Sequence, residues 1–315
     1  MRDQTVYEKE PEKLPFDTWF QGYREAASYL EEHGVAEGEL DAWYLLEAVT
    51  GMSKTEFLLH REELLESGQA GQIREYLRLI EERAKRIPLS YLTGWRNFCG
   101  LEFAVNAAVL IPRQDTECLV EAVLPYTKEA RILDLCTGSG CIAISLAILG
   151  EPASVTGTDI SEAALEVAKS NGERLLKEKR QKLHWIQSDL FRQIEGKFDL
   201  IVSNPPYIAS RVIETLEPEV KDFEPRLALD GEEDGLAFYK RILAEASFYL
   251  NEGGRLAFEI GYDQGRAVSD WMRQQGFDGV EVIKDLAGLD RIVIGQKRNP
   301  QKEEKELRKA KGKEE

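Results

Sequence analysis

The fold is decided by one stretch of the chain, Ile132-Leu133-Asp134-Leu135-Cys136-Thr137-Gly138-Ser139-Gly140, after which comes the apolar run Ile142-Ala143-Ile144. A short apolar run that ends in a glycine-containing segment is typical of a buried strand that turns tightly into a helix. Glycine lets the backbone approach a ligand closely at the amino-terminal end of that helix. The stretch therefore predicts a strand, a ligand-binding loop and a helix.

Strands and helices alternate from Arg131 onward. Strand-like runs occur at 131–136, 153–158, 183–187, 198–203, 254–260, 279–284 and 290–296, and helical runs at 141–149, 161–178, 235–250 and 263–275. Such alternation predicts a parallel sheet with helices on both faces. The last two strands have no room for a helix between them, so we expect them to form an antiparallel pair at one edge. The predicted fold class is α/β, a Rossmann-like seven-stranded sheet of the methyltransferase type with one antiparallel edge strand.

The chain before this sheet has a helical pattern. Between residues 16 and 86 apolar residues recur at three- and four-residue steps, and glycines interrupt the pattern, which predicts three to five short helices. At this spacing Trp43 and Tyr44 favour core packing over a partner-docking face. The predicted organisation is a small all-helical domain at 16–86, a β-hairpin linker at 87–114, the α/β domain at 115–297 and a charged, disordered tail at 298–315, with residues 1–15 also poorly ordered.

Composition limits the class of protein. No apolar run approaches the ~20 residues that span a bilayer, and neither the three histidines nor the four cysteines have paired metal spacing, so we expect a cytoplasmic protein without a metal site. The chain carries 57 acidic against 41 basic residues, a net charge of −16. Proteins that bind nucleic acid need cations to neutralise phosphates, so a protein or small-molecule substrate is favoured over DNA.

The glycine loop and Asp159 predict a nucleotide-type cofactor site. Asp159 ends the next strand, 21 residues after Gly138, where a carboxylate can accept hydrogen bonds from both hydroxyls of an adenosine ribose. The same spacing fits the dinucleotide pattern G-x-G-x-x-G/A and also a purely structural turn. Asp189 after the third strand favours a methyl donor over NAD if it faces an adenine amino group, but it is equally compatible with a helix cap. The candidate cofactor-binding residues from this pattern are Cys136, Thr137, Gly138, Ser139, Gly140, Asp159 and Asp189.

The segment Asn204-Pro205-Pro206-Tyr207 follows the strand 198–203 and is the candidate catalytic loop. Open α/β sheets bind ligands at the carboxyl ends of their strands. The Asn204 amide oxygen and the Pro205 carbonyl can each accept one N–H of a planar NH₂ group, and both prolines make the loop rigid. Tyr207 can stack on the planar group. A Pro-Pro surface turn is the alternative, and the position after a strand of this sheet favours catalysis.

Several further blocks of sequence resemble the HemK/PrmC family, the methyltransferases that modify the glutamine of the Gly-Gly-Gln loop in peptide-chain release factors. The resemblance extends from about residue 20 to 297. Besides the two loops, it rests on Tyr91-Leu92-Thr93-Gly94, Val109-Leu110-Ile111-Pro112-Arg113, Glu224-Pro225-Arg226-Leu227-Ala228-Leu229, Asp234-Gly235-Leu236, Glu259-Ile260-Gly261 and Asp285-Leu286-Ala287-Gly288-Leu289-Asp290-Arg291. It implies a protein-glutamine N-methyltransferase with S-adenosylmethionine as cofactor and release factors as partners, and we expect a monomer. It also implies that Leu190 and Asn204 contact the cofactor, that the helical domain recognises the partner and that Asn204 to Tyr207 hold the glutamine.

Two positions depart from the family pattern, and other functions remain open. Gln114 stands where the family usually has proline, and Leu190 stands where some members carry an aromatic residue against the adenine. Arg113 is as compatible with a surface ion pair to Glu117 as with a role in binding. Alternative functions are glutamine methylation of a ribosomal protein, adenine-N6 methylation of nucleic acid with the base flipped out, and a non-catalytic cofactor-binding adaptor.

Overall fold

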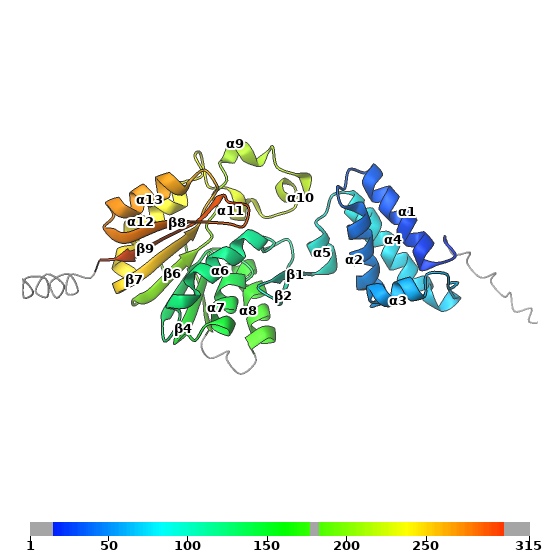
Figure 1. Ribbon diagram of the computed structural model, residues 1–315, viewed down its shortest axis with the longest axis horizontal. Helices are drawn as coiled ribbons and strands as arrows, with labels where there is room; N and C mark the ends of the chain where they lie inside the picture. The colour runs from blue at the N-terminus through cyan, green and yellow to red at the C-terminus, as the bar shows by residue number, and fades with distance from the viewer. Residues whose placement is uncertain (1–14, 177–182, 299–315) are drawn as a thin grey trace, which may run out of the picture. The chain divides into compact units, whose positions relative to one another are not determined.

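The computed structural model describes residues 15–176 and 183–298, and the chain divides after Gly94 into two compact units (Figure 1). Each unit has a hydrophobic core of its own. Within the described ranges, no helix is both long and apolar enough to cross a bilayer. The expectations for residues 1–14 and for the tail from 299 onward concern residues outside the described part of the chain.

The first unit is all-helical, as the spacing of its apolar residues predicts. Its elements are α1 (Trp19–Glu32), α2 (Gly38–Thr50), α3 (Lys54–Leu59), the 3₁₀ turn η1 (Ser67–Gln69), α4 (Ala70–Ala84) and α5 (Leu89–Thr93). Ser53 begins α3 with a capping box, in which its side chain and that of Glu56 each accept from the other's backbone N–H. Trp43 is buried and packs on Phe57, with ring centroids 5.1 Å apart, so core packing is confirmed for Trp43.

The prediction of a hairpin linker at 87–114 is wrong for its first residues. Residues 89–93 form the helix α5, and the hairpin follows as β1 (Trp95–Phe98) and β2 (Leu101–Ala104), which pair antiparallel. Pro88 precedes the helix with a fixed φ, and Gly94 ends it in the left-handed conformation at φ 83°. Leu89 and Leu92, three residues apart, both pack against the helical core. The helix therefore belongs to the first unit, and only 95–104 is hairpin.

The second unit contains a seven-stranded sheet in the order β5-β4-β3-β6-β7-β9-β8. The strands are β3 (Arg131–Leu135), β4 (Ser154–Asp159), β5 (Leu183–Gln187), β6 (Phe198–Ser203), β7 (Leu250–Glu259), β8 (Phe277–Lys284) and β9 (Asp290–Lys297). The antiparallel pair β8–β9 lies at one edge, as predicted. The reversed strand is β9, which is inserted between β7 and β8, so β8 is the outermost strand.

Helices cover both faces of this sheet (Figure 1). One core joins the sheet to α6 (Glu117–Val123), α7 (Cys141–Leu149) and α8 (Glu162–Leu176). The other core joins it to α12 (Ala237–Tyr249) and α13 (Gly265–Gln274). Successive residues of β3 alternate between the two cores, with Ile132 in the first and Leu133 in the second. The sheet is therefore buried on both sides, and its carboxyl edge is where loops can form a site.

Short helices follow the candidate catalytic loop. They are α9 (Ser210–Ile213), α10 (Pro218–Lys221) and α11 (Arg226–Leu229), and they precede α12. The sequence pattern did not predict them, because four-residue helices are too short to show a hydrophobic period. The 3₁₀ turn η2 (Gln114–Thr116) precedes α6, and η3 (Leu124–Tyr126) follows it.

Candidate functional site

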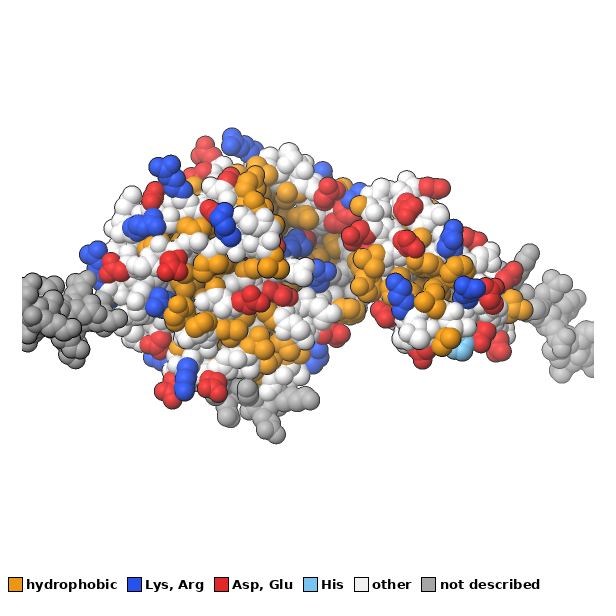
Figure 2. Space-filling model, viewed as in Figure 1, with side chains coloured by type: hydrophobic (Ala, Val, Ile, Leu, Met, Phe, Trp, Pro, Cys, Tyr) orange, Lys and Arg blue, Asp and Glu red, His pale blue; other side chains and the backbone are white. Residues whose placement is uncertain are grey.

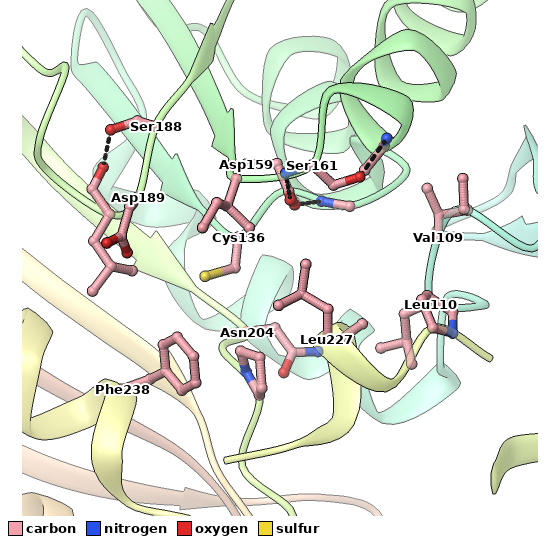
Figure 3. A pocket seen from close by; sticks show the side chains of 18 of the residues that line it. Val109, Leu110, Cys136, Asp159, Ser161, Ser188, Asp189, Asn204, Leu227 and Phe238 are labelled. Carbon is pink, nitrogen blue, oxygen red and sulfur yellow. Dashed lines mark hydrogen bonds between the residues drawn. The ribbon is translucent and has the colours of Figure 1, made fainter. Parts of the chain in front are cut away.

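A cavity of about 300 Å³ opens at the carboxyl ends of β3, β4, β5 and β6 (Figure 3). This volume is at the lower end of the range for small-molecule sites. Its wall combines the glycine loop, the ends of β4 and β5, and the candidate catalytic loop. Leu227 of α11 and Phe238 of α12 add apolar surface from later in the chain. The cavity lies where the strand order changes direction between β3 and β6, the usual ligand position in such sheets.

The glycine loop turns around a buried carboxylate, Asp134. Its Oδ2 accepts from the Thr137 hydroxyl at 2.6 Å and from the Ala143 amide at 3.2 Å. Burial raises the pKa of Asp134 to about 7. Its position at the end of an apolar strand is the sequence signal that could have identified this carboxylate, which was not among the predicted site residues.

The predicted residues of the glycine loop divide into two groups. Cys136 and Gly138 line the cavity, whereas Thr137, Ser139 and Gly140 are buried beneath it and shape the turn. Gly138 and Gly140 both have positive φ, 54° and 80°. A Cβ on Gly140 would also lie 2.8 Å from the Trp185 ring. Glycine at 140 is therefore required by conformation and by space.

Asp159 connects the end of β4 to the glycine loop. Its Oδ2 accepts from the Gly138 amide at 2.9 Å, and its Oδ1 accepts from the Ser161 amide at 2.9 Å. Burial raises the pKa of this carboxyl, and the backbone N–H groups act in the opposite direction. A carboxylate has about four lone-pair sites, so each oxygen can accept one more hydrogen bond. Asp159 lines the cavity, so these acceptor sites are available to hydroxyl groups of a ligand there.

Asp189 and Leu190 also line the cavity, after β5. The helix-cap alternative is wrong for Asp189, because residues 190–193 form a turn and no helix begins in the described residues between β5 and β6. The carboxylate instead pairs with Arg241 at 2.6 Å and with Arg192 at 3.4 Å. The turn is instead held by Ser188, whose hydroxyl donates to the Leu190 carbonyl at 2.7 Å. Leu190 adopts φ 51° and presents an apolar side chain where some family members carry an aromatic ring.

The candidate catalytic loop follows β6 directly. Asn204 and Pro206 line the cavity, Pro205 is buried behind them, and Tyr207 faces a neighbouring surface cavity. The Asn204 amide nitrogen donates to the Thr116 hydroxyl at 3.3 Å, which leaves its oxygen available as an acceptor. The Tyr207 carbonyl accepts from Gln264 at 3.0 Å. Burial raises the pKa of the Tyr207 hydroxyl above its usual value.

Known proteins share both units of the chain. The family described as PrmC N-terminal domain matches residues 21–94, and the family described as Methyltransferase small domain matches residues 114–219. The release factor glutamine methyltransferase of Agrobacterium fabrum is 41% identical over 275 residues, which cover 85% of this chain and 93% of that protein. The protein of the same name from Geobacter sulfurreducens is 40% identical over 270 residues, with the same two coverages. The chain belongs to the release factor glutamine methyltransferase family.

This family membership confirms the resemblance drawn from the sequence. Among solved structures, a methyltransferase from Pyrococcus furiosus superimposes with a TM-score of 0.50 at 19% identity, covering 70% of this chain and 99% of that one. At this identity the likeness shows the fold alone. It agrees with the α/β sheet that the alternation of strands and helices predicts.

The segment 224–229, which includes α11, forms one side of the cavity. Glu224 is buried, accepts from the Ile111 amide at 3.2 Å and pairs with the Arg113 guanidinium. The alternative of an Arg113–Glu117 ion pair is therefore wrong, because Arg113 pairs with Glu224, and Glu117 accepts from the Cys99 amide at 2.8 Å. Glu224 thus joins the 111–113 segment to the start of α11. Pro225 and Leu227 beside it line the cavity.

Proposed function

We propose that this chain transfers a methyl group from S-adenosylmethionine to the side-chain amide nitrogen of the glutamine in the Gly-Gly-Gln motif of release factors, and so modulates translation termination. The observation that carries the proposal is the position of Asn204, held by Thr116 at the wall of the cavity, in a chain of the release factor glutamine methyltransferase family. The substrate acts on the ribosome, so the proposed location is the cytoplasm.

The residues of the cavity fit the cofactor. Asp159 has acceptor capacity for ribose hydroxyls, Gly138 allows close approach of the backbone, and Leu190 offers an apolar surface to the adenine. Arg241 holds Asp189 at the rim. When bound, S-adenosylmethionine supplies an electrophilic methyl group on a sulfonium. Cys136, Thr137, Ser139 and Gly140 complete the proposed cofactor loop, with Asn204 between cofactor and substrate.

The catalytic loop would act by positioning the acceptor amide. An amide nitrogen is a weak nucleophile, so its alignment and the polarisation of its N–H bonds contribute most to the rate. The Asn204 oxygen would accept one N–H and the Pro205 carbonyl the other. Pro205 and Pro206 are buried and have fixed φ, so these acceptors are held in place before the substrate arrives. The Tyr207 ring would stack on the planar amide group of the substrate.

A methyl-transfer assay with labelled S-adenosylmethionine tests the proposal. The purified protein would be incubated in parallel with a release factor, the same factor with its Gly-Gly-Gln glutamine replaced by alanine, ribosomal proteins and DNA. We expect label on the wild-type factor alone. Label on a ribosomal protein or on adenine in DNA, with none on the factor, would overturn it.

The proposed partners exclude nucleic acid, and the proposed oligomeric state is a monomer. The net charge of −16 supports the first point. On the face drawn in Figure 2, acidic and basic side chains are interspersed rather than gathered by sign. Salt-dependent DNA binding in a mobility-shift assay would contradict the absence of a nucleic-acid partner. A dimer in analytical sedimentation would contradict the monomeric state.

A further inference from the structure

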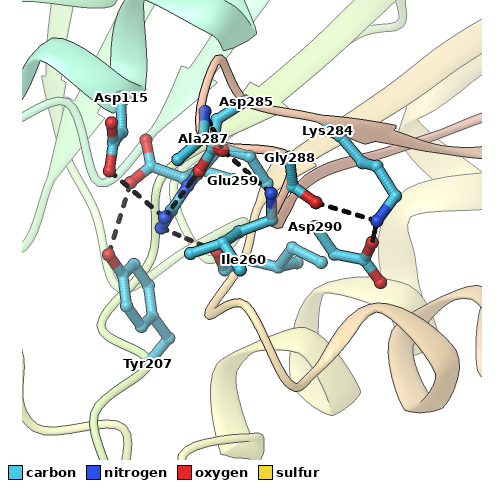
Figure 4. A network of polar contacts seen from close by, with 11 residues as sticks. Asp115, Tyr207, Glu259, Ile260, Lys284, Asp285, Ala287, Gly288 and Asp290 are labelled. Atoms are coloured by element: carbon cyan, nitrogen blue, oxygen red, sulfur yellow. Dashed lines mark hydrogen bonds and ion pairs between the residues drawn. The ribbon is translucent and has the colours of Figure 1, made fainter.

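A further buried carboxylate lies next to the catalytic loop, at the end of β7. Glu259 is 1% exposed and follows three fully buried apolar residues of that strand, Leu256, Ala257 and Phe258. Its Oε1 accepts from the Tyr207 hydroxyl at 3.4 Å (Figure 4). Its Oε2 is buried and has no hydrogen-bond partner among the described residues. An incompletely paired buried carboxylate costs stability, so packing alone does not explain a glutamate at this position.

The nearest cation does not form an ion pair with Glu259. Arg291 donates to Asp285 at 3.0 Å and to the Ile260 carbonyl at 3.4 Å, and it pairs with Asp115 at 3.1 Å (Figure 4). Burial raises the pKa of Glu259 to about 7, and the Thr116 side chain and the charge of Arg291 oppose that effect. The hydrogen-bond partner of the Glu259 carboxylate is therefore the Tyr207 hydroxyl.

This hydroxyl belongs to the catalytic loop. Tyr207 is the last residue of that loop, and Thr116 accepts from Asn204, its first residue. Gln264 holds the Tyr207 backbone carbonyl but does not bond its ring hydroxyl. Glu259 is thus the side chain that holds the Tyr207 ring hydroxyl.

We propose that Glu259 is a positioning residue for methyl transfer, which orients the Tyr207 ring at the end of the catalytic loop. This inference rests on the proposed function, because the acceptor amide is assigned to the same loop. Glu259 is not among the residues that line the cavity. Its effect is therefore on the rate of transfer and not on cofactor affinity.

A double-variant cycle tests the proposal. Glu259→Gln keeps the size of the side chain and removes the carboxylate, and Tyr207→Phe removes the hydroxyl. We expect each to lower kcat about tenfold, the value of one hydrogen bond to a charged group, with the KM for S-adenosylmethionine within about twofold of wild type. The double variant should lose less than the product of the two single losses. Independent losses that multiply, or a wild-type kcat in Glu259→Gln, would overturn the proposal.

A second measurement separates this inference from the function itself. In protein with ¹³C-labelled tyrosine, the Tyr207 ring signal, assigned with Tyr207→Phe, should shift in Glu259→Gln. The matched control is Glu281→Gln, an exposed glutamate on β8, which should leave that signal and kcat unchanged. If the wild-type protein methylates no release factor, the proposed function fails, and the ring signal still decides the role of Glu259. An unshifted signal in Glu259→Gln would refute that role.

Discussion

The glycine loop and the catalytic loop form adjoining walls of one cavity, but they are held by different kinds of contact. In the glycine loop, Asp134 accepts from residues three and nine positions later, and Asp159 accepts from Gly138 across 21 positions. The catalytic loop is held by Glu259, Gln264 and Thr116, which lie 52, 57 and 88 positions away from their partners. The first loop is supported by its own neighbourhood in the chain, and the second by distant elements.

This difference in support means that cofactor binding and methyl transfer can be disturbed separately, the first through the glycine loop and the second through the catalytic loop. A change in the glycine loop disturbs a strand-to-helix turn and so alters both folding and the cofactor site. A change at an anchor of the catalytic loop leaves the sheet and the glycine loop intact. The two loops should therefore respond differently to substitution, and the following predictions test that difference from the largest expected effect to the smallest.

Asn204→Ala should lower kcat by about 10²- to 10³-fold, because it removes an acceptor positioned for the transition state. Steady-state methylation of release factor measures the loss, and calorimetric titration should show cofactor affinity changed by less than about tenfold. The unfolding temperature serves as the control for folding. Wild-type turnover by this variant would instead favour a non-catalytic role for the loop.

Gly140→Ala should reduce the free energy of unfolding by about 2 to 4 kcal/mol. A left-handed alanine costs about 1 to 2 kcal/mol, and the new Cβ would meet the Trp185 ring at 2.8 Å, which adds overpacking. Gly138→Ala is the matched control, since it has positive φ and nothing within 4 Å of the added Cβ. Urea denaturation of both variants checks the difference. Equal losses would mean that conformation alone explains Gly140.

Asp159→Asn should weaken cofactor binding by about 10- to 100-fold, the range for hydrogen bonds to a charged group. At saturating S-adenosylmethionine its kcat should stay close to wild type, which is the reverse of the pattern expected for Asn204→Ala. Titration calorimetry and kinetics at varied cofactor concentration give the two quantities. A large loss of kcat with unchanged affinity would contradict the proposed division between the loops.

The smallest effect concerns the pH dependence of stability near Asp134. Burial raises its folded pKa from 3.8 to about 7, so the carboxyl ionises more readily in the unfolded chain. The contribution of Asp134 to the free energy of unfolding is complete below about pH 4, which is its pKa in the unfolded chain. This contribution is lost as the pH rises through about 7. Glu259 acts in the same direction. Asp134→Asn should remove only the share of this pH dependence that comes from Asp134.

The share of Asp134 in the change of unfolding free energy with pH is at most about 1.4 kcal/mol per pH unit, the value for one proton. Denaturation of the wild type and of Asp134→Asn at about pH 6 and about pH 7 measures the difference between their slopes. Parallel slopes would show that Asp134 does not titrate in this range. The comparison sharpens the contrast between the loops, because Asp134 supports the glycine loop alone.

Much of the fold was predictable from local patterns. The seven strands and the four long helices of the α/β unit fall within a few residues of their predicted ranges, because each has its own hydrophobic period and turn residues. The prediction failed at 89–93, where a five-residue helix is too short for such a period. The insertion of β9 between β7 and β8 was also beyond local patterns, since strand order depends on long-range pairing.

The sequence by itself determined the nature of the site. The residue types and spacing of the glycine loop, Asp159 and Asn204 to Tyr207 define a cofactor loop and an amide-holding loop, because close backbone approach and rigid carbonyls are properties of glycine and proline themselves. Only the tertiary structure decided what holds the second loop in place. Thr116 and Glu259 become its supports because η2 and the end of β7 each contact the loop that follows β6, and no local pattern encodes contacts between segments so far apart in the chain.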